Sequence, residues 1–446
     1  MIGGRSRTGL SDRRDAAWDA GLYGAAALVA LAVALFASIP LQREWARMAL
    51  APYAAGTGVA AALAVRGAGV RARAGLAVAV LLGAALLPLA LEATWRAREG
   101  PGSHAQSEAI VTEEAARALL DGRDPYEATY LRGPLAARPL GTKSHFPYLP
   151  GMLAFGLPRA LDGLRPLADA RIAFALTDAR IAFALTTLGL AALALRLWDT
   201  SGDRRLRAFQ VLAVLPTGAL PMATGGGDLP VLALMLLSLV LVERGKPGAA
   251  GLAAGVAAGM KQTAWLLVPF LLLAARDERR RRAWVRMAAP AAAASGGLIL
   301  PFLLWNPAAF VEDVVLFPLG LGQQASPAGT PTVGTLIIRA LPFVRGPVAA
   351  ALIALVLAVG VYLMVRHPPE SAARAAGHAA LVMSLALVLA PAARFGYLIY
   401  PINLLTWARL LSNGDEDRVP DGPLRAFRGG PQGHADGPDR HAPGVM

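Results

Sequence analysis

Runs of roughly twenty apolar residues recur along the chain, separated by short polar segments rich in arginine. An α-helix of this length crosses the hydrocarbon core of a bilayer. The runs are continuous and rich in leucine and alanine, whereas the strands of a membrane barrel would alternate apolar and polar residues. We therefore predict an all-α, multi-pass transmembrane helical bundle of about 11–13 helices, some of them broken or re-entrant. The candidate segments are 19–40, 47–66, 74–93, 148–163, 169–198, 207–223, 229–243, 249–275, 284–305, 346–365, 372–392 and 394–411.

One long polar stretch, from Ser107 to Pro150, interrupts this pattern. Apolar residues recur at helical spacing between Glu108 and Asp121, which predicts a short amphipathic helix. Gly122 is a plausible stop for that helix, and Asp124-Pro125-Tyr126 favours a turn, because proline restricts the residue before it. We expect this helix to lie on the membrane surface within the first large loop.

The arginines set the expected orientation, because cytoplasmic loops carry an excess of positive charge. We predict a cytoplasmic N-terminal tail over 1–18, a transmembrane domain over 19–411 and a disordered cytoplasmic tail over 412–446. The large loop, 94–147, is then extracytoplasmic, in a protein of the cell membrane. The basic residues that carry this assignment include Arg5, Arg7, Arg13, Arg14, Arg66, Arg71, Arg73, Arg204, Arg205 and Arg207.

Two segments do not fit a simple alternation of spans. Positive charge flanks 249–275 on both sides, so this segment is either a hairpin of two half-length helices broken near Lys261 or an exception to the charge rule. The same parity problem affects 148–163, which could be re-entrant rather than spanning. Because non-helical backbone at membrane depth is tolerated where it lines a cavity, both breaks point to one cavity.

The nonapeptide DARIAFALT occurs twice in tandem, at 169–177 and 178–186. The simplest interpretation is a duplication that lengthens one helix. It leaves Asp178 and Arg180 at a depth where they need to pair.

Composition narrows the function classes. The chain has 446 residues, a net charge of +13 and no cysteine, which excludes disulfides and thiol chemistry. The positive charge lies beside apolar runs and no nucleic-acid motif accompanies it, so we expect no nucleic-acid partner. No P-loop, HExxH or GxGxxG context is present, so ATP and nicotinamide chemistry have no support, and we assign no metal ligands.

The predicted surface helix offers the first candidate for catalysis. Glu108 could act as a general base toward a hydroxyl group, or it could be a solvated acid favoured by the helix dipole. Glu113 is the alternative base, although its spacing to Arg117 also suits a surface ion pair. Asp124 could bind a ligand or serve only in the turn.

Three further charges lie within or beside apolar runs. Asp228 follows three glycines that would allow close approach of a ligand, or it caps the next helix. Lys261 at membrane depth suggests a site, with snorkelling to the interface as the alternative. Arg394 has no acidic neighbour in sequence, and an anionic ligand such as a phosphate would explain it. His145 and Tyr148 could line the same opening.

Several motifs, taken in order, resemble a known family. They are an acidic residue sixteen positions before Asp124, AARALLDGRDPYE, HFPYLP, the block that starts GGGDLP and contains MKQTAW, and RFGYLIYP. Their order and spacing, from Glu108 to about Pro401, are similar to the polyprenyl-phosphate-mannose-dependent bacterial glycosyltransferases of the GT-C superfamily.

The resemblance implies inverting transfer of a hexose, mannose in that branch, from a polyprenyl-phosphate donor to an extracytoplasmic glycan, glycolipid or protein acceptor. Glu108 takes the place of the family's catalytic acid, where Asp is usual. Arg394 and Lys261 would stabilise the phosphate, while Tyr126, Phe146 and Tyr148 would pack on sugar or lipid. No cofactor is implied, because the lipid-linked donor is a substrate, and a metal requirement stays open.

A secondary transporter or lipid-carrier permease is the alternative, since broken helices and membrane-depth charges suit it as well. The acidic outer loop before a Pro/Tyr turn, and the absence of evident inverted repeats, favour the transferase.

Overall fold

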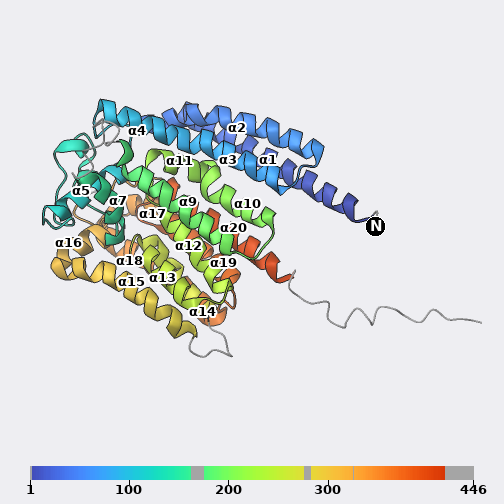
Figure 1. Ribbon diagram of the computed structural model, residues 1–446. Helices are drawn as coiled ribbons and strands as arrows, with labels where there is room; N and C mark the ends of the chain where they lie inside the picture. Colours follow the sequence, from blue (N-terminus) through green and yellow to red (C-terminus); the bar gives the residue numbers. More distant parts are fainter. Residues whose placement is uncertain (1–2, 162–174, 276–282, 325, 417–446) are drawn as a thin grey trace, which may run out of the picture.

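The computed structural model describes residues 3–161, 175–275, 283–324 and 326–416 (Figure 1). Within these ranges the structure is helical without named strands, and one isolated bridge pairs Gly329 with Ala393. Seven of the described helices are long and apolar enough to cross a membrane, or eight if a bent pair, Gly202–Val214 with Pro216–Thr224, counts as one span. The seven are Leu10–Phe36, Pro40–Arg66, Val70–Glu99, Ala179–Leu197, Trp284–Trp305, Pro342–Arg366 and Ala372–Leu389. This confirms the all-α, multi-pass fold. The sequence-based count was higher because it also included segments that form only short helices.

The first helix, α1 (Gly3–Phe36), begins well before residue 19, where the predicted tail was expected to end. It packs against α2 (Pro40–Arg66). Asp19 anchors this helix, because its carboxylate is buried and binds Arg73 Nε at 2.5 Å and Arg207 Nη1 at 2.5 Å. These ion pairs fix the middle of α1 to α3 (Val70–Leu81) and α10 (Gly202–Phe209).

The centre of the bundle is α12 (Leu229–Glu243). Residues 229–241 are all buried, as expected for a helix that is apolar on every face. It packs against α9 (Ala179–Leu197) and α13 (Pro247–Ala258). Because α12 begins directly after Asp228, the central helix carries that carboxylate into the interior.

The segment 249–275 forms the predicted hairpin. Helix α13 ends at Ala258, Lys261 has extended backbone, and a 3₁₀ turn (Gln262–Leu266) leads into α14 (Val268–Ala274). Along α13, Gly251 and Gly255 lie against the Met287 and Ala291 carbonyls of α15 (Ala283–Trp305), so these two helices run in parallel. Helix α14 ends at Ala274, and α15 begins at Ala283 near the start of α13, where Gly248 approaches the Arg286 carbonyl. Lys261 lies at the break between α13 and α14.

The polar stretch contains α5 (Ser107–Leu120), close to the predicted 108–121. Gly122, with φ 71°, ends it: the Arg123 N–H donates to the Ala118 carbonyl at 2.8 Å and the Gly122 N–H to the Leu119 carbonyl at 3.0 Å. Helix α5 packs on α7 (Leu153–Ala160). A Cβ at Gly156 would lie 2.2 Å from the Thr112 carbonyl oxygen, so only glycine permits this approach. In the described part of the predicted segment, 148–161, the structure has this eight-residue helix and a preceding 3₁₀ turn.

A buried ionic network holds α5 in place. Arg96, from α4 (Leu87–Glu99), donates two hydrogen bonds to the Glu113 carboxylate at 2.9 and 2.7 Å, and another to Asp178 at 2.8 Å. Asp178 also accepts from Arg180 Nη2 at 2.9 Å, which confirms the pairing expected from the duplication. The second repeat copy thus supplies the start of α9, whereas most of the first copy, 169–174, lies outside the described residues.

The two ends of the bundle differ in content (Figure 1). One, here called the α5 end, contains α5, α7, α16 (Pro307–Val311) and α17 (Val333–Ala340). The opposite one, here called the α10 end, contains α10, α14 and the connection between α2 and α3. Helices α18 (Arg345–Arg366), α19 (Ala372–Leu389) and α20 (Ile399–Glu416) connect the two ends.

Candidate functional site

Glu108 lies in the first turn of α5 and faces two cations from distant parts of the chain. Its Oε2 accepts a hydrogen bond from the Gly227 N–H at 3.0 Å and lies 3.5 Å from Lys261 Nζ. Its Oε1 lies 3.5 Å from Arg394 Nη1. Burial alone would raise the pKa of Glu108, but Lys261, Arg394 and the Gly227 N–H outweigh it and hold the pKa below the usual range. Glu108 is therefore a carboxylate at neutral pH.

The buried ammonium group of Lys261 lies close to a second carboxylate, that of Asp228. Its Nζ lies 2.7 Å from Asp228 Oδ1, which also accepts a hydrogen bond from the Tyr400 hydroxyl at 2.7 Å. The ammonium also lies 4.9 Å from the centre of the Tyr148 ring, within range of a cation–π interaction. Asp228 thus compensates the lysine charge independently of Glu108.

Loop backbone fixes these side chains. Gly225 has φ 105°, a left-handed conformation that closes α11 (Pro216–Thr224) and starts the turn that presents the Gly227 N–H. Opposite it, the Leu149 N–H donates to the Met260 carbonyl at 3.1 Å, and the Gly151 N–H to the Gly259 carbonyl at 2.9 Å. The breaks in segments 148–163 and 249–275, which were predicted to share one cavity, are therefore joined by backbone hydrogen bonds beside Lys261.

Arg394 is the most accessible member of the group. It precedes a 3₁₀ turn (Phe395–Leu398) between α19 and α20, and its side chain is 41% exposed. The Glu108 side chain is 12% exposed and that of Lys261 5%. An anion can therefore reach the guanidinium first, next to a carboxylate able to take a proton. We call Glu108, Asp228, Lys261 and Arg394 the ionic site.

Three other predicted residues, Glu113, Asp124 and Tyr126, lie outside direct contact with this group. Both Glu113 oxygens bond to Arg96, so Glu113 belongs to the network that positions α5. The Asp124 carboxylate accepts a hydrogen bond from the Tyr126 N–H at 2.9 Å, so Asp124 stabilises the turn, which was the alternative to ligand binding. Tyr126 donates its hydroxyl to the Tyr148 carbonyl at 3.0 Å and packs edge-on against Phe310, beside the site rather than in it.

Two contributing side chains were missed from the sequence, and the glycines before Asp228 were interpreted only as room for a ligand. Gly227 supplies a backbone N–H, Tyr400 supplies a hydroxyl, and Tyr397 lies within electrostatic range of Lys261, Arg394 and Glu108. Both tyrosines belong to the RFGYLIYP stretch, so the motif held a signal for them. A backbone donor leaves no such signal.

His145 belongs to a second cluster at the same end. Its ring stacks on Phe317 at 4.0 Å, its Nδ1 lies 3.0 Å from the Gly141 carbonyl, and its Nε2 is 3.8 Å from both Glu312 and Asp313. Burial raises the pKa of Asp313 to about 8. The Phe146 N–H lowers it, and the charges of Glu312 and Asp124 raise it. The folded protein therefore keeps Asp313 protonated at neutral pH.

This protonation predicts a pH-dependent stability. The pKa of Asp313 is near 4 in the unfolded chain and about 8 in the folded chain. The contribution of this group to the free energy of unfolding is therefore present at low pH and is lost as the pH rises to about 8. Its contribution falls by about 1.4 kcal/mol per pH unit across that window. Asp313→Asn should flatten the decline in thermal unfolding temperature between pH 6 and 8, whereas the exposed control Asp121→Asn should not. Equal slopes in Asp313→Asn and the unmodified protein would contradict this assignment.

The fold and the ionic site define a multi-pass membrane protein with a site suited to an anionic ligand and a proton transfer. The family model for Glycosyltransferase family 87 matches residues 146–391, more than half of the chain. The chain therefore belongs to glycosyltransferase family 87 and is a membrane glycosyltransferase. The match includes Tyr148, Asp228 and Lys261, whereas Glu108 and Arg394 lie outside it. Comparison with curated proteins and with solved structures gave no match.

Family membership agrees with the resemblance to glycosyltransferases seen in the sequence, and it favours a transferase over a secondary transporter or lipid-carrier permease. It implies a sugar donor, an acceptor and a membrane lipid environment.

Proposed function

We propose that the protein transfers a hexose, mannose by resemblance, from a polyprenyl-phosphate donor to a hydroxyl group of a glycan, glycolipid or protein acceptor. The observation that carries this proposal is the position of Glu108 3.5 Å from both Lys261 and Arg394. A base beside two cations suits a reaction in which an acceptor loses a proton while a phosphate gains charge. The Arg394 side chain is 41% exposed and can therefore reach a phosphate that approaches from outside the buried part of the site.

The reaction then proceeds by inversion at the anomeric carbon. The acceptor oxygen forms a bond to the anomeric carbon. At the same time the bond between that carbon and the phosphate oxygen breaks, and polyprenyl phosphate leaves. The acceptor proton passes to Glu108, so the carboxylate becomes neutral as the phosphate gains one negative charge. Fixed cations stabilise that charge strongly where water is scarce.

Donor binding has to separate Glu108 from Arg394, because no sugar fits between groups 3.5 Å apart. Lys261 stays paired with Asp228, whereas the half-exposed Arg394 side chain is free to turn toward the phosphate. Once the phosphate shares the Arg394 charge, the carboxylate loses a stabilising partner and becomes a stronger base. Donor binding thus prepares Glu108 for proton transfer.

Donor choice tests the proposal. Purified protein in liposomes, with a membrane extract as acceptor pool, should transfer label from polyprenyl-phosphate mannose and not from a nucleotide-linked mannose. Glu108→Gln protein provides the background. Equal transfer from the nucleotide sugar would contradict the proposed donor class.

We further propose that the α5 end faces outward from the cell membrane and that the N-terminus is cytoplasmic. Supporting this, arginines lie in the connections and at the helix termini of the α10 end, as the positive-inside bias expects of a cytoplasmic face. These include Arg66, Arg71, Arg204, Arg205 and Arg244.

The absence of native cysteine makes this orientation directly measurable, because an introduced cysteine is the only thiol. Arg132→Cys and Arg244→Cys each replace an exposed arginine, at the α5 end and the α10 end respectively. In intact cells a membrane-impermeant maleimide should label the first and should label the second only after permeabilisation. The reverse pattern would place the ionic site in the cytoplasm.

A further inference from the structure

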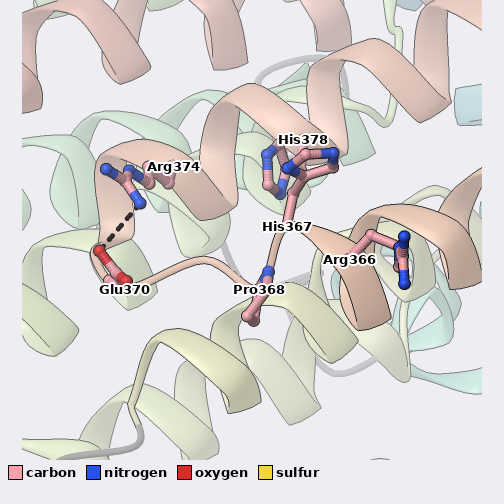
Figure 2. A pocket seen from close by; sticks show the side chains of 6 residues that line it. All are labelled: Arg366, His367, Pro368, Glu370, Arg374 and His378. Atoms are coloured by element: carbon pink, nitrogen blue, oxygen red, sulfur yellow. Dashed lines mark hydrogen bonds and ion pairs between the residues drawn. The ribbon is translucent and has the colours of Figure 1, made fainter.

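A pocket of about 440 Å³ lies at the connection between α18 and α19, away from the ionic site (Figure 2). Four of its six lining residues can carry positive charge and one is acidic. The lining residues are Arg366, His367, Pro368, Glu370, Arg374 and His378.

The one acid in the pocket is weakly engaged. Glu370 pairs with Arg374 at 2.8 Å, but the two side chains are 76% and 61% exposed, and such surface pairs contribute little stability. Phosphate oxygens can therefore take the place of Glu370 on Arg374. The Oε1 atom of the nearby Glu243 accepts a hydrogen bond from the Ala372 N–H at 3.1 Å, in the first turn of α19.

The pocket also contains a polar atom that lacks a partner. Nδ1 of His378 is buried and has no hydrogen-bond partner among the described residues, although the ring packs edge-on against Phe270. Buried polar atoms are almost always hydrogen-bonded, so a turn of the ring that exposes this nitrogen to the pocket would let a ligand supply the missing partner. Figure 2 shows the His367 ring next to that of His378, and the two rings interact electrostatically.

The position of the pocket favours an amphiphile over a free ion. The 18-residue α19 connects it with the segment that carries Arg394, and a helix of that length covers about 27 Å. The pocket is therefore at the α10 end, at the opposite membrane face from Glu108. The outer face of α18 leads to it through Val361, Tyr362 and Val365, which are 52%, 55% and 70% exposed. Acyl chains can pack along this face while a head group reaches the arginines.

We propose that this pocket binds the phosphate of an anionic phospholipid from the leaflet at the α10 end. Basic pockets between membrane helices on the cytoplasmic side are suited to such head groups. The assignment is independent of the transferase reaction, since none of its residues belongs to the ionic site.

Native mass spectrometry of the full chain in detergent tests the proposal, with phosphatidylglycerol, phosphatidylcholine and inorganic phosphate as probes. Phosphatidylglycerol should bind and the other two should not displace it at equal concentration. Arg366→Gln and Arg374→Gln should each weaken binding about fivefold, and together about twenty-fivefold, from the usual contribution of a basic residue near an anionic surface. Arg66→Gln, another exposed helix-terminal arginine at the α10 end, is the matched control and should change affinity less than twofold.

Unchanged affinity in the double variant, or equal binding of phosphatidylcholine, would overturn the proposal. Displacement by inorganic phosphate at equal concentration would assign the pocket to a free anion and would overturn it too. Should the double variant lose its helical circular dichroism, the three-probe comparison on the unmodified protein still decides.

Discussion

Glu108→Gln is expected to reduce the turnover of donor by about 10²–10⁴-fold, the range in which a positioned base contributes. The amide retains an oxygen that can accept the Gly227 N–H, now 3.0 Å from the carboxylate, so the shape of the site persists. Lys261 keeps Asp228 at 2.7 Å, so no buried cation is left uncompensated. The variant should therefore fold and bind donor but fail to accept the acceptor proton.

The matched control is Glu114→Gln, because Glu114 lies on the same helix and is half-buried. Its turnover should stay within twofold of the unmodified protein, and both variants should melt near the same temperature. A Glu108→Gln protein with unchanged kcat would remove Glu108 from the chemistry.

Arg394→Gln is expected to lower kcat/KM for the donor by about 10²–10³-fold, comparable to the loss of one fixed group that stabilises developing charge. Its side chain is 41% exposed, so the loss falls on ligand binding rather than on folding. Arg394→Lys should recover part of the rate, because lysine keeps the charge but lacks the planar pair of donors.

For comparison, Arg339→Gln alters another exposed arginine at the α5 end and should leave donor use unchanged. A kcat/KM for Arg394→Gln equal to that of this control would contradict a phosphate contact at Arg394.

Local patterns predicted much of the fold. The spacing of apolar residues gave α5 within one residue at each end, because one face of that helix is buried on α7. The cost of a charge in an apolar run located the break at Lys261, and the need of Asp178 and Arg180 to pair was met. Each of these features depends mainly on residues that are close to one another in the sequence.

The arrangement of the site was harder to predict, because it depends on contacts distant in sequence. Glu108 was identified as a carboxylate on a surface helix and Arg394 as a charge without an acidic neighbour in sequence, and only the tertiary fold brings them to 3.5 Å. The His145 ring stacks on Phe317, which is distant in sequence, so no local pattern indicates this position of the histidine. The anchoring of α1 likewise depends on contacts between Asp19 and the arginines Arg73 and Arg207 from other helices.

A structure of the protein bound to polyprenyl phosphate, the expected product, tests the central claim most directly. The account predicts phosphate oxygens within about 3 Å of the Arg394 guanidinium, the distance of a charge-assisted hydrogen bond. It also predicts that Glu108 and Arg394 move beyond their present 3.5 Å, while Lys261 stays with Asp228. A phosphate bound away from Arg394, with the Glu108–Arg394 pair intact, would contradict it.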